Sequence, residues 1–304
     1  MMQQSFWALA AALFFSIMAA FVKLCSGQLG FLEIVFYRSL IGVISISFFV
    51  YTNHLSLKTE HVGGHIRRSV LGTLSICLWF YTLGKMNFGT NMTLTYTTPL
   101  FMAANFVILA MMRKKPAPWL MVVSILVGFA GVTTVLQPSF ESDQFVPALV
   151  CLLVAFIDLI TYWQMKELGR MKEPSWRIVF YFTCFGTVTG LVGSFLFEGG
   201  MHMPDMTSVV GIIGMGICAT LGQLCTTKSY AYGNMLLSSA LGFSAIPISA
   251  LISYFFFGET TTAIGLVGMS LIIGAGIGAS FTTKKMEARE KAEAEALAKK
   301  AEAA

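Results

Sequence analysis

Ten long apolar runs follow one another along the chain, and only short polar connections separate them. A helix needs about 20 mostly apolar residues to cross the hydrocarbon core of a bilayer. The runs centre near residues 4–24, 30–50, 67–84, 88–112, 118–136, 145–165, 176–197, 206–227, 233–257 and 263–281. They are too long, and alternate too little, for the strands of a membrane β-barrel. The sequence therefore predicts an all-α polytopic membrane protein with ten transmembrane helices.

The composition excludes an ordinary soluble protein. Of the 304 residues, 56% are hydrophobic and 12% are charged, whereas globular proteins carry about 25% charged residues. The first run lacks a basic segment before it and is too long for the core of a signal peptide, so we expect it to remain as the first span. The chain is then expected in an inner, plasma-type membrane, where its six scattered cysteines need no oxidising compartment.

The distribution of basic residues predicts the orientation. When the N-terminus is placed inside, most of the 20 lysine and arginine residues, including Arg67 and Arg68, fall in inner connections or in the C-terminal tail. Cytoplasmic connections of membrane proteins carry such an excess of positive charge. We therefore expect both termini in the cytoplasm. This asymmetry also accounts for the net charge of +5, and no nucleic-acid partner is expected.

A short pattern occurs twice, once in each half of the chain. Tyr81-x-x-Gly84-x-Met86 precedes Pro99, and Tyr230-x-x-Gly233-x-Met235 precedes Pro247 at almost the same distance. Five spans separate the two copies, and because five is odd the second copy enters the membrane upside down. Inverted repeats of this kind are typical of secondary transporters, whose substrate site lies near the midplane between the halves.

Several motifs resemble the EamA-type family of the drug/metabolite transporter superfamily. They are Glu33-Ile-Val-Phe-Tyr-Arg38-Ser-Leu, Tyr96-Thr-Thr-Pro99-Leu-Phe, Leu126-Val-Gly128-Phe-Ala-Gly131-Val and Phe257-Gly258-Glu259. The resemblance covers residues 5 to about 283, although the Gly-Glu pair of the family is kept only in the second half. It implies ten helices in two inverted five-helix repeats, and secondary transport of a small metabolite across the inner membrane.

We accordingly divide the chain into a first repeat at residues 1–140, an inverted second repeat at 141–283 and a charged cytoplasmic tail at 284–304. Pro99 and Pro247 are expected to kink the corresponding spans of the two repeats, because a proline inside a helix removes a backbone hydrogen bond.

Asp158 is the leading candidate for a coupling site. It lies about thirteen residues, or roughly 20 Å, inside the sixth span, so its carboxyl group cannot reach the outer interface and must face the bundle interior. Ionisable groups at this depth are costly and often functional. We interpret Asp158 as a site for a coupling proton; a structural aspartate hydrogen-bonded to a neighbouring helix is the alternative.

Three further charged residues lie toward the outer side. Arg38 and Glu33 belong to the second span, and Lys23 ends the first. We expect them to form an outer charge cluster or gate, and a direct role of Arg38 in binding an anionic group is the alternative.

The fourth span carries a polar stripe that predicts a cavity wall. The spacing of 4, 3, 4 and 3 residues places its members on one helical face, which the lipid would not tolerate. They are Asn91, Thr95, Thr98, Met102 and Asn105, with Tyr96 beside them. Interhelical hydrogen bonding is the alternative. Trp79, Tyr81, Trp163 and Gln223 are further candidates for the cavity, although each is also consistent with packing.

The leading functional hypothesis is a secondary active transporter that exports or exchanges a small polar or amphipathic metabolite, such as an amino acid, by alternating access. An uptake or exchange carrier for a larger metabolite such as S-adenosylmethionine is the runner-up, and a non-transporting receptor or scaffold comes from another class. An enzyme is not expected, because no nucleophile–base or metal-ligand constellation lies at membrane depth. No cofactor or metal is expected. The expected partners are a small-molecule substrate and the lipid bilayer; a coupling proton or cation, and a homodimer, are left open.

Overall fold

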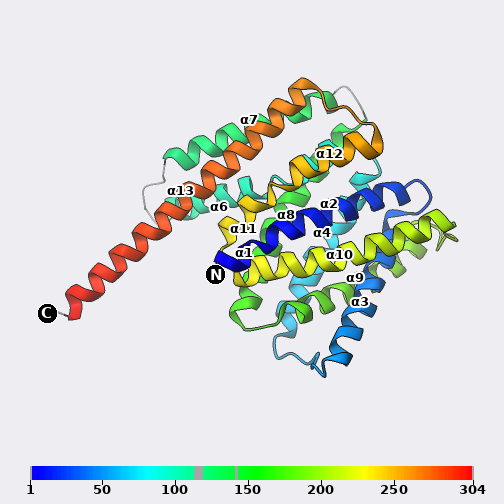
Figure 1. Cartoon of the computed structure of the whole chain (residues 1–304), viewed down its shortest axis with the longest axis horizontal. Coiled ribbons are helices and arrows are strands. Elements are labelled where there is room, and N and C mark those ends of the chain that lie inside the picture. Colours follow the sequence, from blue (N-terminus) through cyan, green and yellow to red (C-terminus); the bar gives the residue numbers. More distant parts are fainter. Residues whose placement is uncertain (1, 113–118, 141–142, 303–304) are drawn as a thin grey trace.

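The computed structural model describes residues 2–112, 119–140 and 143–302, and within these ranges it contains helices and no strand (Figure 1). The helices are α1 (Met2–Ser5), α2 (Trp7–Cys25), α3 (Phe31–Thr52), α4 (Val62–Leu83), α5 (Phe88–Thr95), α6 (Thr98–Met112), α7 (Trp119–Phe140), α8 (Phe145–Arg170), α9 (Ser175–Phe197), α10 (Met206–Tyr232), α11 (Met235–Gly242), α12 (Ala245–Phe257) and α13 (Ala263–Glu302).

The thirteen helices make ten spans, because α1 with α2, α5 with α6, and α11 with α12 each form one broken span. Seven spans are long and apolar enough to cross a membrane, and α7 and the first part of α13 are shorter apolar helices. The remaining span, α4, carries His65, Arg67 and Arg68 among its apolar residues. The prediction of an all-α protein with ten spans is confirmed.

The packing of the helices follows the two halves of the chain. The second span of each half packs against its counterpart, as α3 on α9, and so does the fifth, as α7 on α13 (Figure 1). The first span of each half packs on the third span of the other, as α2 on α10 and α8 on α4. Exchanging the halves leaves these pairs unchanged, as expected for two repeats of inverted topology. The residue boundaries at 140 and 283 stay a prediction.

Glycines bring the paired helices close together. A Cβ atom on Gly131 of α7 would lie 2.8 Å from the carbonyl oxygen of Gly268 in α13, and one on Gly190 of α9 would lie 2.8 Å from the carbonyl oxygen of Leu32 in α3. No side chain larger than hydrogen fits these contacts without a shift of backbone. Membrane helices use small residues in this way because packing, rather than burial from water, holds them together.

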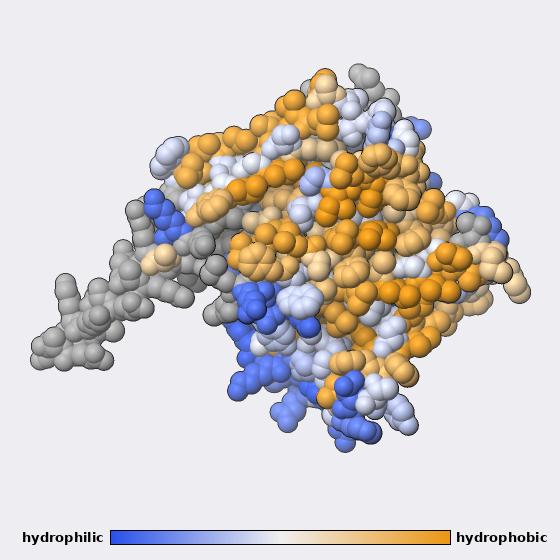
Figure 2. Space-filling model, in the orientation of Figure 1, coloured by the Kyte–Doolittle hydropathy of each residue, from blue (hydrophilic) through white to orange (hydrophobic). Residues whose placement is uncertain are grey.

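The connections gather at two opposite ends. At one end, the hydroxyl of Thr59 donates to Glu173, and Lys166 donates to the carbonyl of Gly233 at 2.7 Å. At the other end, Lys23 lies 2.6 Å from Glu259. Figure 2 shows hydrophobic residues over most of the visible face and hydrophilic residues toward its lower edge. Which end faces the cytoplasm stays a prediction.

The last helix continues into the predicted tail. α13 runs from Ala263 to Glu302 without a break near residue 284, and Figure 1 shows its last part extending beyond the bundle. The predicted tail is therefore continuous with the tenth span.

Candidate substrate cavity

Two spans are interrupted at matching positions of the two halves. α5 ends at Thr95 and α6 begins at Thr98, while α11 ends at Gly242 and α12 begins at Ala245. Each interruption lies just before a predicted kink residue, Pro99 in α6 and Pro247 in α12. A proline in the first turn of a helix loses no intrahelical hydrogen bond, because its missing N–H would have had no partner there. Each proline therefore begins a second half-helix.

A cavity of about 60 Å³ lies at the first interruption. Its lining comes from both halves of the chain and consists of Phe15, Trp79, Thr95, Tyr96, Thr98, Pro99, Asp158, Tyr162, Tyr230, Ser239 and Gly242. A smaller hollow of about 30 Å³ shares Tyr96, Tyr162 and Tyr230 and reaches the N-terminal part of α2 at Ala8. A water molecule needs roughly 10–15 Å³ of such volume. This conformation therefore has room for a few waters, and a metabolite requires the helices to separate.

Three tyrosines dominate the wall. The rings of Tyr162 and Tyr230 stack with their centroids 3.9 Å apart and their planes at 12°, and Tyr96 lines the same space from the interruption of the fourth span. Aromatic faces pack against apolar groups and attract cations, while the phenolic hydroxyls offer hydrogen bonds. The wall is thus suited to an amphipathic molecule.

Asp158 supplies the acidic group of the cavity. The hydroxyl of Ser75 in α4 donates to Oδ1 of Asp158 in α8 at 2.6 Å, which joins the two halves of the chain at this point. No other acidic side chain is among the described residues of the lining. The carboxyl group is therefore placed to accept a proton or to bind a positively charged group from the cavity.

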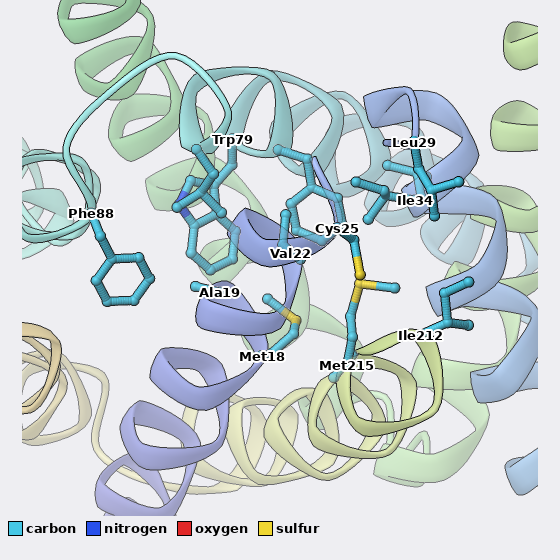
Figure 3. Packing of buried hydrophobic residues seen from close by; sticks show 14 of the residues in the cluster. Met18, Ala19, Val22, Cys25, Leu29, Ile34, Trp79, Phe88, Ile212 and Met215 are labelled. Atoms are coloured by element: carbon cyan, nitrogen blue, oxygen red, sulfur yellow. The ribbon is translucent and has the colours of Figure 1, made fainter. Parts of the chain in front are cut away.

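Several of the predicted cavity residues come together at this place. Thr95, Tyr96 and Thr98 line the cavity at the interruption of the fourth span, and Trp79 and Asp158 join them from α4 and α8. Trp79 also belongs to the apolar cluster that surrounds the end of α2, together with Met18 and Val22 (Figure 3). The cavity is therefore backed by buried apolar side chains on this side.

Other members of the predicted set do not line the cavity. Asn91 accepts a hydrogen bond from the indole of Trp79 at 3.0 Å and donates to Thr82 at 2.8 Å. This network agrees with the interhelical alternative for Asn91. The prediction of one continuous polar face assumed an unbroken helix. Because α5 ends at Thr95 and α6 begins at Thr98, residues on the two sides of this interruption do not share one helical face. Asn105 is half-buried in α6 and is not among the described residues that line the cavity.

The remaining aromatic and amide candidates also lie elsewhere. Tyr81 packs edge-on against Phe31 with their ring centroids 5.8 Å apart. Trp163 packs against Phe106 at 6.2 Å. Gln223 is buried within α10 and is absent from the described lining. For Tyr81 and Trp163, the packing interpretation agrees with these contacts.

The expected outer cluster of Lys23, Glu33 and Arg38 does not form as one unit. Lys23 contacts Glu259 at 2.6 Å, and the buried carboxylate of Glu33 accepts from the backbone N–H of His202 at 2.9 Å. Arg38 instead points into the bundle, where it lies over the ring of Phe182. The five-residue spacing of Glu33 and Arg38 puts them on different faces of the helix, and each finds a partner in the second half of the chain.

Arg68 is the charged residue that sequence reasoning missed. It was counted with the basic residues of an inner connection, yet its side chain is 3% exposed within α4. It is close enough to Asp158 and Tyr162 to interact with them electrostatically. The available signal was its neighbour Arg67: adjacent residues on a helix lie about 100° apart, so only one of the two can face the surface.

A known family model matches the first part of the chain. Residues 3–137 match the EamA-like transporter family. This part of the chain is thus similar to that family. The resemblance predicted from the motifs is confirmed.

Relatives extend the similarity over most of the chain. The pseudopaline exporter CntI of Pseudomonas aeruginosa (strain UCBPP-PA14) is 27% identical over 280 residues, which cover 91% of this chain and 95% of that protein. A riboflavin transporter of Vibrio cholerae is 24% identical, covering 90% and 91%. An S-adenosylmethionine uptake transporter of Rickettsia bellii is 22% identical, covering 83% and 84%.

A solved crystal structure shares the fold. It aligns with a TM-score of 0.70 at 17% sequence identity, covering 94% of this chain and 99% of the other. The EamA match, the named relatives and the apolar helices together support a multi-pass membrane protein that transports a small molecule.

Proposed function

We propose that the protein is a secondary active transporter that exports or exchanges a small polar or amphipathic metabolite, such as an amino acid, by alternating access. The observation that carries this proposal is the position of Asp158. Its carboxyl group accepts from Ser75 of the other repeat and faces a tyrosine-lined cavity at an interrupted span. Secondary transporters place substrate and ion sites at such interrupted spans.

Asp158 acts in this proposal as the coupling site. Binding a proton neutralises its charge and changes what the cavity accepts, so the gradient biases which loaded state forms. The aromatic faces of Tyr96, Tyr162 and Tyr230 hold the body of the metabolite. The basic end of the bundle faces the cytoplasm, following the distribution of lysine and arginine.

Alternating access requires that each end can open in turn. The two ends are held by related contacts: Lys23 of α2 donates to the carbonyl of Met86 at 2.9 Å, and Lys166 of α8 donates to that of Gly233 at 2.7 Å. Each lysine belongs to the first span of its half, and each carbonyl lies in the connection that follows the third span. Releasing one contact while keeping the other exposes the cavity to one side.

A larger metabolite such as S-adenosylmethionine is the second candidate. Aromatic faces beside a carboxylate suit an organic cation such as a sulfonium, and one of the relatives is named as an uptake transporter for that compound. The direction of transport would then be inward.

The test is transport by the full-length protein in liposomes. Vesicles loaded with a mixture of amino acids are diluted into buffers with and without an inward proton gradient, and the released compounds are measured by mass spectrometry; radiolabelled S-adenosylmethionine is tested in parallel. Gradient-stimulated release, relative to protein-free vesicles, supports the first candidate. Stimulated uptake of S-adenosylmethionine instead supports the second. Movement of neither compound class, with folded protein, contradicts both and leaves the receptor or scaffold.

A further inference from the structure

Two buried arginines lie beside one aromatic ring where α3, α4 and α9 meet. The guanidinium carbon of Arg38 is 5.1 Å from the ring centroid of Phe182, and that of Arg68 is 4.4 Å from it. The two residues are 2% and 3% exposed. A cation–π contact contributes about 2 kcal/mol when desolvated, whereas burying an ion costs several kcal/mol. The ring alone therefore does not account for two like charges in this position.

These arginines retain unpaired hydrogen-bond donors. Among the described residues, none accepts a hydrogen bond from Nε of Arg38 or from Nε and Nη1 of Arg68. The hydroxyls of Ser39 and Thr73 are likewise buried without a described partner. Buried donors without acceptors are costly. Within the described part of the chain, this group therefore has hydrogen-bond donors in excess of acceptors.

The two hydroxyls lie close to each other in the same region. A Cβ atom on Gly186 of α9 would lie 2.5 Å from the hydroxyl of Ser39 and 3.9 Å from that of Thr73. Ser39 follows Arg38 in α3. On α4, a side chain at Gly72 would collide with the guanidinium of Arg68 and the ring of Phe182. Glycine therefore leaves the room that the arginine occupies.

One face of α4 connects this group to the cavity. Arg68, Gly72 and Ser75 are spaced by 4 and 3 residues, so they share a helical face, and Ser75 donates to Asp158 at 2.6 Å. Arg68 interacts electrostatically with Asp158 and Tyr162. Asp158 supplies at most one negative charge against the two positive charges of the arginines, so an anionic group from outside the protein is needed for balance.

We propose that Arg38 and Arg68 bind the carboxylate group of the transported metabolite, whose apolar or aromatic body packs against the tyrosines of the cavity. This inference rests on the proposed transport function and names its substrate class: an amphipathic organic carboxylate, including zwitterionic amino acids. The planar guanidinium matches a carboxylate with two parallel hydrogen bonds, and the hydroxyls of Ser39 and Thr73 supply further donors.

The test measures binding and does not require transport. The purified full-length protein is heated with increasing concentrations of 3-phenylpropanoate or of the uncharged 3-phenylpropanamide, and the unfolding temperature is recorded. We expect the carboxylate to raise the unfolding temperature and the amide to have little effect. Arg38→Gln and Arg68→Gln should each raise the half-saturating carboxylate concentration roughly ten- to a hundredfold, as expected for a lost charge-assisted hydrogen bond.

Arg67→Gln is the matched control. Arg67 adjoins Arg68, but it is 61% exposed and pairs with Glu167 at the surface. This variant should keep the response of the wild type. Arg68→Lys retains the charge without the planar fork, so it should bind the carboxylate with intermediate strength.

Folding is checked without a ligand. Arg38→Gln removes one of two like charges beside the same ring, so it should leave the unfolding temperature unchanged or raise it. Equal stabilisation of the wild type by carboxylate and amide would overturn the proposal, as would an unchanged carboxylate preference in both glutamine variants. Arginine-dependent binding of the carboxylate without any transport would support the carboxylate site and contradict the transport function. Transport without a preference for the carboxylate would support the transport function and contradict the carboxylate site.

Discussion

The helix pairs α4–α8 and α2–α10 are equivalent when the two halves of the chain are exchanged, yet their centres differ in chemistry. Between α4 and α8, Ser75 donates to Asp158. Between α2 and α10, the contacts are apolar: Met18 and Val22 of α2 belong to one buried cluster with Ile212 and Met215 of α10 (Figure 3). The comparison shows that the inverted repeat supplies a frame of equivalent helices, while a few side chains in one pair supply the chemistry.

The largest expected effect comes from removing the charge of the polar pair. Asp158→Asn should abolish proton-driven transport in liposomes, a loss of at least about a hundredfold, because the amide cannot bind and release a proton. Exchange of substrate for substrate should persist, since it needs no net proton movement. Asp143→Asn, in an exposed connection, is the control. Full coupled transport by Asp158→Asn would end the coupling proposal.

The apolar pair should respond through stability. A Cβ on Gly214 of α10 would lie 2.8 Å from ring atoms of Phe21 in α2, so Gly214→Val should destabilise the protein by about 1–3 kcal/mol through overpacking. Thermal unfolding in detergent measures this. Gly63→Ala, where a Cβ meets nothing within 4 Å, should be neutral or slightly stabilising. An unchanged unfolding temperature for Gly214→Val would show that the pair is packed more loosely than described.

The hydrogen bond within the polar pair should have a smaller functional effect. Ser75→Ala removes the donor to Asp158, and we expect proton-driven transport to fall roughly tenfold, because hydrogen bonds to charged groups contribute about 1.5–3 kcal/mol. Ser270→Ala is matched to it, since that exposed hydroxyl bonds the carbonyl of Leu266 in its own helix at 2.9 Å. Equal rates for Ser75→Ala and the wild type would show that Asp158 acts without this contact.

Replacing the lysines that hold the two ends of the bundle should loosen opposite ends of it. Lys23→Met removes the donor to Met86 and should increase hydrogen–deuterium exchange at residues 84–87 by a few-fold. Lys166→Met removes the donor to Gly233 and should do so at residues 233–234. The two variants serve as controls for each other. If both variants increased hydrogen–deuterium exchange at the same end, the proposal that the two lysines hold opposite ends of the bundle would be contradicted.

The smallest expected effect is a pH dependence at the end of α8. Burial tends to raise the pKa of Glu173, but hydrogen bonds from Thr59 and Arg177 lower the pKa below its ordinary value of 4.5. The carboxylate therefore stabilises the fold above about pH 4.5, and this contribution is lost as the pH falls through the lowered pKa. Glu173→Gln should flatten this acid limb of thermal stability. An identical acid limb in both proteins would contradict it.

Much of the fold follows from the sequence because the bilayer restricts it. A hydrocarbon core accepts helices with internally satisfied backbones, so the lengths of the apolar runs predict the ten spans, and the repeated Tyr-x-x-Gly-x-Met pattern predicts their inversion. The site follows less completely. Asp158, Trp79 and Tyr96 were predicted and line the cavity, whereas Asn91 and Tyr81 were predicted and lie elsewhere.

The difference has a physical reason. Depth in the membrane can be counted along the chain, and it singles out Asp158 as a group that must face inward. The direction in which the Arg68 side chain points cannot be deduced from its position along the chain. It depends on contacts with Phe182, Gly72 and Asp158, which belong to three different helices. The sequence alone determined the class, the spans and the acidic residue at membrane depth. The tertiary structure decided which side chains of the two repeats meet, since helix packing joins residues far apart in the chain.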